Sequence, residues 1–237
     1  MIRVAAAADV HFSKTSAGTL RRRFEEVPER ADVLLWAGDF TAHGSAEEAA
    51  VLADEIAGLD FPMVGVLGNH DYHLGEEKKI TDVLEEAGIT MLEGSSVTID
   101  TESGPLGVAG TKGFGGGFVG ACASDFGEDE MKSFVRHTKD LSAALEGALE
   151  DLSDGPRVAL LHYAPVEGTL QGERLEIYPF LGSYLLGACI DRAGADLVLH
   201  GHAHAGVENG VTPAGIAVRN VAEPVIGQPF AIYSLSD

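Results

Sequence analysis

Five apolar runs in this 237-residue chain are each followed by side chains that bind cations. These side chains are carboxylates, one amide and imidazoles, and in chain order they are Asp9, His11, Asp39, Asn69, His162, His202 and His204. In an open α/β sheet, sites form beyond the carboxyl ends of the strands, so residues far apart in sequence can meet there. Seven donors exceed the number that one tetrahedral zinc ion takes, and the set therefore predicts a centre of two ions with a shared carboxylate.

The local spacing of the donors agrees with this prediction. Two pairs stand two residues apart, Asp9 with His11 and His202 with His204. In an extended chain, residues i and i+2 point to the same side, so each pair can face one ion. A glycine, which permits tight turns and close backbone approach, directly precedes three of the donors, at Gly38, Gly68 and Gly201.

The elements that must position these donors are predicted from apolar periodicity. Short apolar runs predict strands at 2–8, 33–37, 62–67, 95–99, 105–110, 157–162, 196–200, 216–221 and 229–234. Amphipathic patterns predict helices from Ser45, whose spacing to Glu48 fits a capping box, over 80–87, over 128–152 and over 179–192.

The order of these elements indicates the fold class. Strands alternate with helices in the first half, as in βαβ units, whereas closely spaced strands after residue 88 and after residue 215 favour antiparallel pairing. We therefore expect an α/β (α+β) fold with mixed sheets flanked by helices. No repeat, linker or change in composition divides the chain, so we expect one domain over residues 1–237.

Composition excludes several classes of protein. The chain is 45% apolar, which is ordinary for a globular protein and excludes disorder. Its net charge of −21 repels nucleic-acid polymers and acidic membrane surfaces, so neither is expected as a partner. The two cysteines, Cys122 and Cys189, are far apart, and no apolar run approaches 18 residues. We expect a cytoplasmic protein without a disulfide framework, and the oligomeric state is left open.

The donor motifs together resemble those of the calcineurin-like metallophosphoesterase superfamily, in the order of that family. The motifs are Asp9-Val10-His11, Gly38-Asp39, Gly68-Asn69-His70-Asp71, a later His162, and Gly201-His202-Ala203-His204. The resemblance implies a four-layer αββα sandwich of two mixed sheets between helices. It also implies that Asp39 bridges two ions, one held with Asp9, His11 and His204, and the other with Asn69, His162 and His202.

The same resemblance implies a phosphoesterase reaction. Two metal ions lower the pKa of a shared water, so that a bridging hydroxide can attack phosphorus. His70 is the histidine of its motif that is not assigned to metal, and it is expected to stabilise charge or to protonate the leaving oxygen, with Asp71 orienting its ring. These ligands do not select among manganese, iron, zinc and nickel, so the identity of the metal stays open. Manganese or iron is favoured, and zinc or nickel is the alternative. The expected substrate is a phosphodiester or a small nucleotide-like phosphomonoester.

Three alternatives are weighed against this hypothesis. A catalytically silent metal-binding scaffold of the same fold would tolerate loss of donors or of His70, yet all of them are present. A protein Ser/Thr phosphatase would carry an arginine soon after Gly38-Asp39, and the segment through Gly44 has none. A DNA-end nuclease would need a cationic surface that a net charge of −21 disfavours.

Other residues carry weaker signals. His43 and His73 either line the substrate pocket or face solvent, Lys112 is a possible phosphate contact, and Arg174 meets a second phosphate or a base unless it is a surface residue. The segment 166–179 is the candidate for substrate selection.

Three further features are read as structural. His137 is expected to be solvated and His200 to be a packed neighbour of the donors. The GxGxxG match from Gly115 to Gly120 is read as a flexible loop rather than as a dinucleotide site, because glycine-dense sequence produces such matches by chance.

Overall fold

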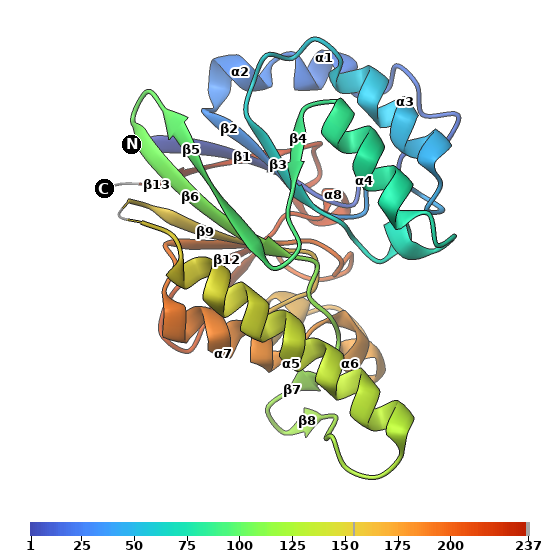
Figure 1. Ribbon diagram of the computed structural model, residues 1–237, viewed down its shortest axis with the longest axis vertical. Helices are drawn as coiled ribbons and strands as arrows, with labels where there is room; N and C mark the ends of the chain where they lie inside the picture. The colour runs from blue at the N-terminus through green and yellow to red at the C-terminus, as the bar shows by residue number, and fades with distance from the viewer. Residues whose placement is uncertain (154, 236–237) are drawn as a thin grey trace.

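The computed structural model describes residues 1–153 and 155–235, and within them two large sheets lie face to face (Figure 1). The first has the order β13-β1-β2-β3-β4, with β13 antiparallel and the others parallel. Its strands are β1 (Ile2–Ala7), β2 (Val33–Ala37), β3 (Met63–Val66), β4 (Ile89–Met91) and β13 (Ala231–Leu235).

The second sheet has the order β11-β12-β10-β9-β6-β5. Its four central strands are parallel, and the strand at each edge is antiparallel to its neighbour. Its strands are β5 (Ser95–Thr101), β6 (Gly104–Thr111), β9 (Arg157–Leu161), β10 (Leu197–His200), β11 (Asn209–Val211) and β12 (Ala217–Asn220). Both sheets are therefore mixed, as the spacing of the strands predicts.

Helices cover the outer face of each sheet and complete the four layers (Figure 1). Over the first sheet lie α1 (Arg21–Phe24), α2 (Val27–Arg30), α3 (Ala46–Ile56) and α4 (Glu77–Glu86). Over the second lie α5 (Asp129–Glu150) and α7 (Tyr184–Ala193). Short elements complete the chain: η1 (His70–Tyr72), β7 (Gly117–Phe118), β8 (Ala121–Cys122), η2 (Glu167–Leu170), η3 (Leu175–Ile177), α6 (Tyr178–Leu181) and α8 (Glu223–Ile226).

Strands that are buried on both faces explain why the sequence shows continuous apolar runs. In β2, Val33 and Leu35 join the core between the two sheets, whereas Leu34 and Trp36 pack under the helices. In β9, Leu160 faces the other sheet and Leu161 faces α5 and α7. A strand enclosed in this way needs apolar side chains on both of its faces. Because both faces are packed, the ends of the strand are held in place.

The predicted helix over 179–192 is wrong in one respect, because two helices occupy this range. α6 ends at Leu181, and Gly182 and Ser183 are extended. Gly182 and Ser183 form β-bridges with Ala164 and Gly117, and Ser183 then caps α7 by accepting a hydrogen bond from the Leu185 amide. These long-range bridges override the helical pattern of the local sequence.

The remaining predicted elements are confirmed within a few residues at their ends. Ser45 caps α3 by accepting a hydrogen bond from the Glu48 amide at 3.3 Å, as the capping-box spacing predicts. The sequence patterns missed β4, β7, β8 and β11, which have only two or three residues each. Runs this short carry no measurable periodicity.

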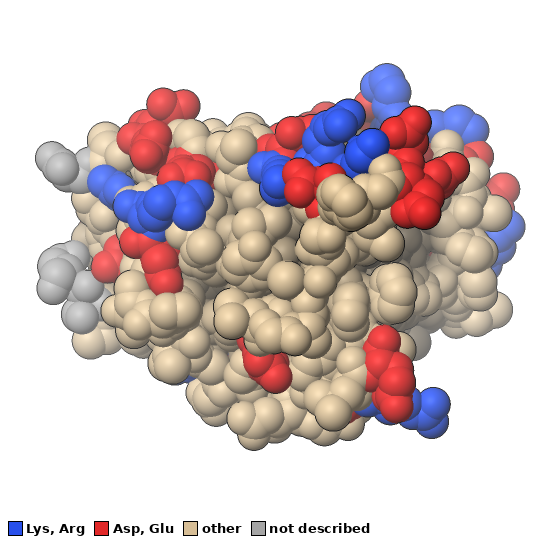
Figure 2. Space-filling model, turned by 90° about the horizontal axis from the view of Figure 1, so that it is seen from below, with Lys and Arg blue, Asp and Glu red and all other residues tan. Residues whose placement is uncertain are grey.

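The molecular surface carries both signs of charge on the face seen from below Figure 1. Figure 2 shows that uncharged residues form most of this face, and that Lys and Arg lie beside Asp and Glu along its upper part. Among the described residues, no helix has the length and apolar character that crossing a lipid bilayer requires.

The extended turn between α6 and α7 leads to a prediction about stability. A Cβ atom at Gly182 would collide with the Ala164 carbonyl oxygen, whereas a Cβ at Gly147, within α5, would meet no atom within 4 Å. We expect Gly182→Ala to lower the free energy of unfolding by about 1–3 kcal/mol. Gly147→Ala, the matched control, should raise it by about 0.5–1 kcal/mol. Urea denaturation measures both, and equal stability of the two variants would contradict the role assigned to this turn.

Candidate metal centre

The seven predicted donors lie just beyond the carboxyl ends of five central strands. β1, β2 and β3 of the first sheet supply Asp9, His11, Asp39 and Asn69, and β9 and β10 of the second supply His162, His202 and His204. Two groups could each hold a metal ion, with ligand atoms within 4.8 Å of one another: Asp9, His11, Asp39 and His204, and Asp39, His162 and His202. Asn69 joins the second group, since its Oδ1 lies 2.9 Å from His162 Nε2. The structure therefore brings all seven together.

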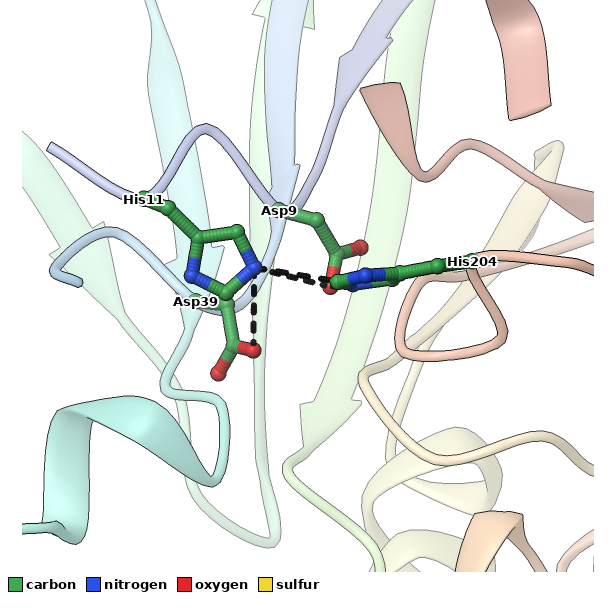
Figure 3. A group of neighbouring side chains, drawn as sticks. All are labelled: Asp9, His11, Asp39 and His204. Carbon is green, nitrogen blue, oxygen red and sulfur yellow. Dashed lines mark hydrogen bonds and ion pairs between the residues drawn. The ribbon is translucent and has the colours of Figure 1, made fainter. Parts of the chain in front are cut away.

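Figure 3 shows the first group, with the His11 ring directed toward Asp39 and His204. His11 Nε2 lies 3.7 Å from Asp39 Oδ2 and 3.5 Å from His204 Nε2. His204 Nε2 in turn lies 2.8 Å from Asp9 Oδ1. Carboxylate oxygens and imidazole nitrogens thus face one common point.

In the second group, several acceptor atoms meet. His162 Nδ1 donates a hydrogen bond to the Ala37 carbonyl at 2.8 Å, which leaves the lone pair on Nε2. That lone pair faces Asn69 Oδ1 and, at 3.4 Å, Asp39 Oδ1. A cation satisfies such a set of oxygen and nitrogen acceptors, and a backbone carbonyl that fixes the ring is the usual support of a ligating histidine.

The backbone is strained at four of the seven donors. Among the described residues, the non-glycine residues with positive φ are Asp9 (58°), His11 (44°), Asp39 (55°) and His202 (69°), and all four are predicted donors. The left-handed conformation costs a non-glycine residue roughly 1–2 kcal/mol, and such strain gathers at functional sites.

This finding corrects the expected geometry of the donor pairs. The chain is not extended at Asp9–His11 or at His202, and left-handed turns bring each pair to the same side. Hydrogen bonds hold the first turn, from the Asp9 amide to the Gly38 carbonyl at 3.0 Å and from the His11 amide to the Asp39 carbonyl at 3.1 Å.

The glycines before the donors allow close approach, as predicted. A Cβ atom at Gly68 would collide with the Asp39 carboxylate, and a Cβ atom at Gly201 with the Asp9 carboxylate. Only a residue without a side chain lets these loops pass directly over the buried carboxylates.

Burial dominates the electrostatics of the centre. Asp9 and Asp39 are 2% and 1% exposed, and burial, reinforced by the charges of Asp9 and Asp71, raises the pKa of Asp39 to about 9. Burial also lowers the pKa of His11 to about 4 and that of His202 to about 3, so both rings are neutral at pH 7. Crowded carboxyl groups among neutral imidazoles form a site whose charge divalent cations would balance.

His70 borders the two groups. Its amide donates to Asp39 Oδ1 at 2.8 Å, and its ring Nδ1 donates to the Ala42 carbonyl at 2.8 Å. The ring lies edge-on to His11, with centroids 4.4 Å apart. With Nδ1 donating, Nε2 is the ring nitrogen that faces away from the Ala42 carbonyl.

The expected contact of Asp71 with the His70 ring is wrong, because the ring is held by the Ala42 carbonyl. The Asp71 carboxylate is fully buried and accepts hydrogen bonds from the Gly68, Phe40 and Thr41 amides and from the Thr41 hydroxyl. It therefore ties the loop after β2 to the loop after β3.

The weaker candidates occupy different places. His43 is exposed and its Nδ1 lies 2.8 Å from Glu48 Oε1, and His73 and Arg174 are also exposed. His137 is exposed, and His200 is buried between the Gly201 carbonyl and the Thr169 hydroxyl, so both predictions are confirmed. Lys112 is buried.

The glycine-rich stretch and the polar segment that stand out in the sequence both have defined structure. The Gly115–Gly120 stretch opens no helix and contains β7, which pairs with β8, so it lacks the turn of a dinucleotide site. The 166–179 segment reaches the centre through Glu173, whose Oε1 accepts a hydrogen bond from the Ala205 amide at 2.7 Å.

Sequence patterns missed two contributors to the centre. The Tyr163 ring packs on the His202 ring with centroids 4.4 Å apart, and the Phe180 carbonyl lies 3.2 Å from His202 Nε2. Tyr163 could have been noted because it follows His162 directly. A backbone carbonyl carries no sequence signal.

Comparison with known families agrees with this geometry. The model of the calcineurin-like phosphoesterase family matches residues 2–206. The chain belongs to the calcineurin-like phosphoesterase family. None of the curated proteins matches it.

Solved structures share the calcineurin-like fold. Phosphopantetheinyl hydrolase (PptH) from Mycobacterium tuberculosis is 15% identical with a TM-score of 0.65, over 92% of this chain and 88% of that one. A candidate 5′-nucleotidase from Staphylococcus aureus, in complex with α-ketoglutarate, is 15% identical with a TM-score of 0.54, over 92% of this chain and 48% of that one. At this identity the likeness establishes the fold, and it confirms the four-layer sandwich.

The raised pKa of Asp39 leads to a prediction about metal binding. A carboxyl group with a pKa of about 9 is protonated at pH 7, whereas a metal ligand is deprotonated. Binding of Mn²⁺ should therefore release about one proton from Asp39, beside any proton on His204, whose pKa is raised by its hydrogen bond to Asp9. The apparent affinity should rise at least about tenfold per pH unit between pH 6 and 8. Titration calorimetry in two buffers of different ionisation enthalpy counts the protons.

The matched variants are Asp39→Asn and Asp60→Asn, the latter at an exposed position. Asp39→Asn should release about one proton fewer than the wild type, and Asp60→Asn should release the same number. An affinity that does not change with pH would contradict the protonated state of Asp39.

Proposed function

We propose that this protein is a dinuclear metal-dependent phosphoesterase that hydrolyses a phosphodiester or a small nucleotide-like phosphomonoester. The observation that carries the proposal is the placement of Asp39 between the two donor groups. Its Oδ2 faces His11 of one group at 3.7 Å, and its Oδ1 faces His162 of the other at 3.4 Å. A carboxylate that offers one oxygen to each group is suited to act as a ligand shared by two ions.

One ion would be held by Asp9, His11, Asp39 and His204, and the other by Asp39, Asn69, His162 and His202. Manganese or iron is favoured, with zinc or nickel as alternatives. When bound, the ions would lower the pKa of a coordinated water and neutralise charge on the phosphoryl oxygens. Because both sheets supply donors, we propose that residues 1–237 act as one domain.

His70 is proposed to act on the leaving group. The hydrogen bond from Nδ1 to the Ala42 carbonyl fixes the ring and makes Nε2 the nitrogen that gains and gives a proton. In this role the imidazolium stabilises negative charge or protonates the leaving oxygen. Asp71 is proposed as a positioning residue, since it holds the loops that carry Asp39 and His70 in register.

The names of two structural neighbours support a small phosphate ester as the substrate. One is named for hydrolysis of phosphopantetheinyl groups and the other as a candidate 5′-nucleotidase. The segment from Gly38 to Gly44 again disfavours a protein Ser/Thr phosphatase, because it offers His43, paired with Glu48, in place of an arginine.

The test compares His70→Ala with His73→Ala, an exposed histidine three residues away. After manganese loading, we expect hydrolysis of bis(p-nitrophenyl) phosphate that is lost on chelation. His70→Ala should lower kcat at least roughly tenfold, in line with general acid contributions of about 10²–10⁴. His73→Ala should retain the wild-type rate, and Asp39→Asn should lose more than His70→Ala because both ions depend on it.

The scaffold alternative makes the opposite prediction. If the wild-type protein and His70→Ala were equally inert after manganese loading, with bound metal verified by elemental analysis, the protein would be a metal-binding scaffold. Equal rates for the wild type and His70→Ala would instead remove His70 from the mechanism.

A further inference from the structure

Among the described residues, Lys112 is the one lysine or arginine that is buried, with 7% of its surface exposed. Its Nζ lies over three aromatic rings, 5.0 Å from the centroid of Tyr72, 5.0 Å from Phe114 and 5.1 Å from Tyr163. Cation–π attraction of this kind stabilises a desolvated ammonium. We call Lys112 with these three rings the lysine cage.

The lysine cage is built from the loops of the candidate metal centre. Tyr72 closes η1, which begins at His70, and Tyr163 follows His162. The Lys112 carbonyl accepts hydrogen bonds from the amides of His162 and Tyr163 at 3.1 and 3.0 Å. The Tyr163 ring also packs on His202, so the cage adjoins the Asn69, His162 and His202 side of the centre.

The ammonium is incompletely partnered by the described residues. It forms no ion pair with them, and its one hydrogen bond goes to the carbonyl of neighbouring Gly113 at 3.2 Å. An ammonium has three N–H donors, and a buried charge is costly unless it is paired. The positive charge held in this way acts on the centre, since it opposes the rise that burial causes in the pKa of Asp39 and adds to the fall that burial causes in the pKa of His162.

The charged form of Lys112 is supported by its surroundings. Desolvation lowers the pKa of the amine, but the negative charge of Glu93 opposes that effect. Glu93 accepts hydrogen bonds from the Lys112 amide and the Thr111 hydroxyl, and its carboxylate is therefore fixed beside the cage. The three ring faces add further attraction for the cation.

We propose that Lys112 determines substrate class, because its fixed charge favours a phosphomonoester dianion over a phosphodiester monoanion. The inference rests on the proposed function and deepens it. A phosphomonoester carries close to two negative charges at pH 7, and a diester carries one. At an effective dielectric constant of about 20, one further unit of charge changes affinity by roughly tenfold at about 12 Å from an ammonium, and by more at shorter distances.

A purely structural role for the lysine cage makes a different prediction. The stem of Lys112 packs among the rings, so its loss would disturb the site for every substrate alike. A charge effect separates the two ester classes, and it is restored by another cation.

The test uses manganese-loaded protein and two esters with the same leaving group, p-nitrophenyl phosphate and bis(p-nitrophenyl) phosphate. Lys112→Met and Lys112→Gln both remove the charge, Lys112→Arg keeps it, and Lys78→Met removes a charge from a side chain that is 86% exposed. The affinity for inorganic phosphate, measured by calorimetry, supplies a readout that is independent of turnover.

We expect both neutral variants to lower kcat/KM for the monoester at least about tenfold relative to the diester and to bind phosphate at least about tenfold more weakly. Lys112→Arg should recover most of both effects, and Lys78→Met should match the wild type. Equal losses for the two esters, or unchanged phosphate affinity in a folded neutral variant, would overturn the inference.

Failure of the proposed function would look different. In that case the manganese-loaded wild type would hydrolyse neither ester, and the phosphate titration would still decide the role of Lys112. Loss of phosphate affinity in the neutral variants would support an anion site at the lysine cage. A wild type that binds no phosphate would exclude one.

Discussion

The burial of acidic groups beside neutral imidazoles is the constraint on which the rest of this structure depends. Asp9 and Asp39 are almost fully enclosed, and burial lowers the pKa of both His11 and His202, so that these two rings are uncharged. Burial, together with the charges of Asp9 and Asp71, raises the pKa of Asp39, so the folded chain disfavours a further negative charge at this place. Cations relieve this repulsion directly, and the backbone strain at four of the donors shows that the surrounding fold maintains the arrangement at a cost.

The fold supplies the rigidity that this arrangement needs. The donors follow strands that are packed on both faces, so the strand ends cannot shift without disturbing two apolar layers. Carboxylates then join the loops: Asp9 accepts a hydrogen bond from the His202 amide at 3.0 Å across the two sheets, and Asp71 joins the loops after β2 and β3. The carboxylates of Asp9 and Asp71 therefore hold the loops of the site in position.

The sequence predicts the layers and the shared location of the candidate donors well, because both depend on local patterns. Apolar runs mark the central strands. A polar residue that follows such a run lies at the carboxyl end of its strand, where the sites of open α/β sheets form. The whole donor set of the candidate centre could be found in this way.

What could not be predicted depends on contacts between distant residues. The left-handed turns at Asp9 and His202 are imposed by neighbouring loops, and the break at Gly182 follows from pairing with Ala164. The hydrogen bond of the His70 ring goes to a backbone carbonyl, and the lysine cage gathers rings from separate loops. No spacing along the chain encodes these contacts.

The central claim is that two ions share Asp39, and anomalous diffraction tests it most directly. Crystals grown with manganese, measured on both sides of the manganese absorption edge, should show two peaks. One should be bounded by Asp9, His11 and His204, the other by Asn69, His162 and His202, with Asp39 between them. A single peak, or peaks away from these side chains, would contradict the account.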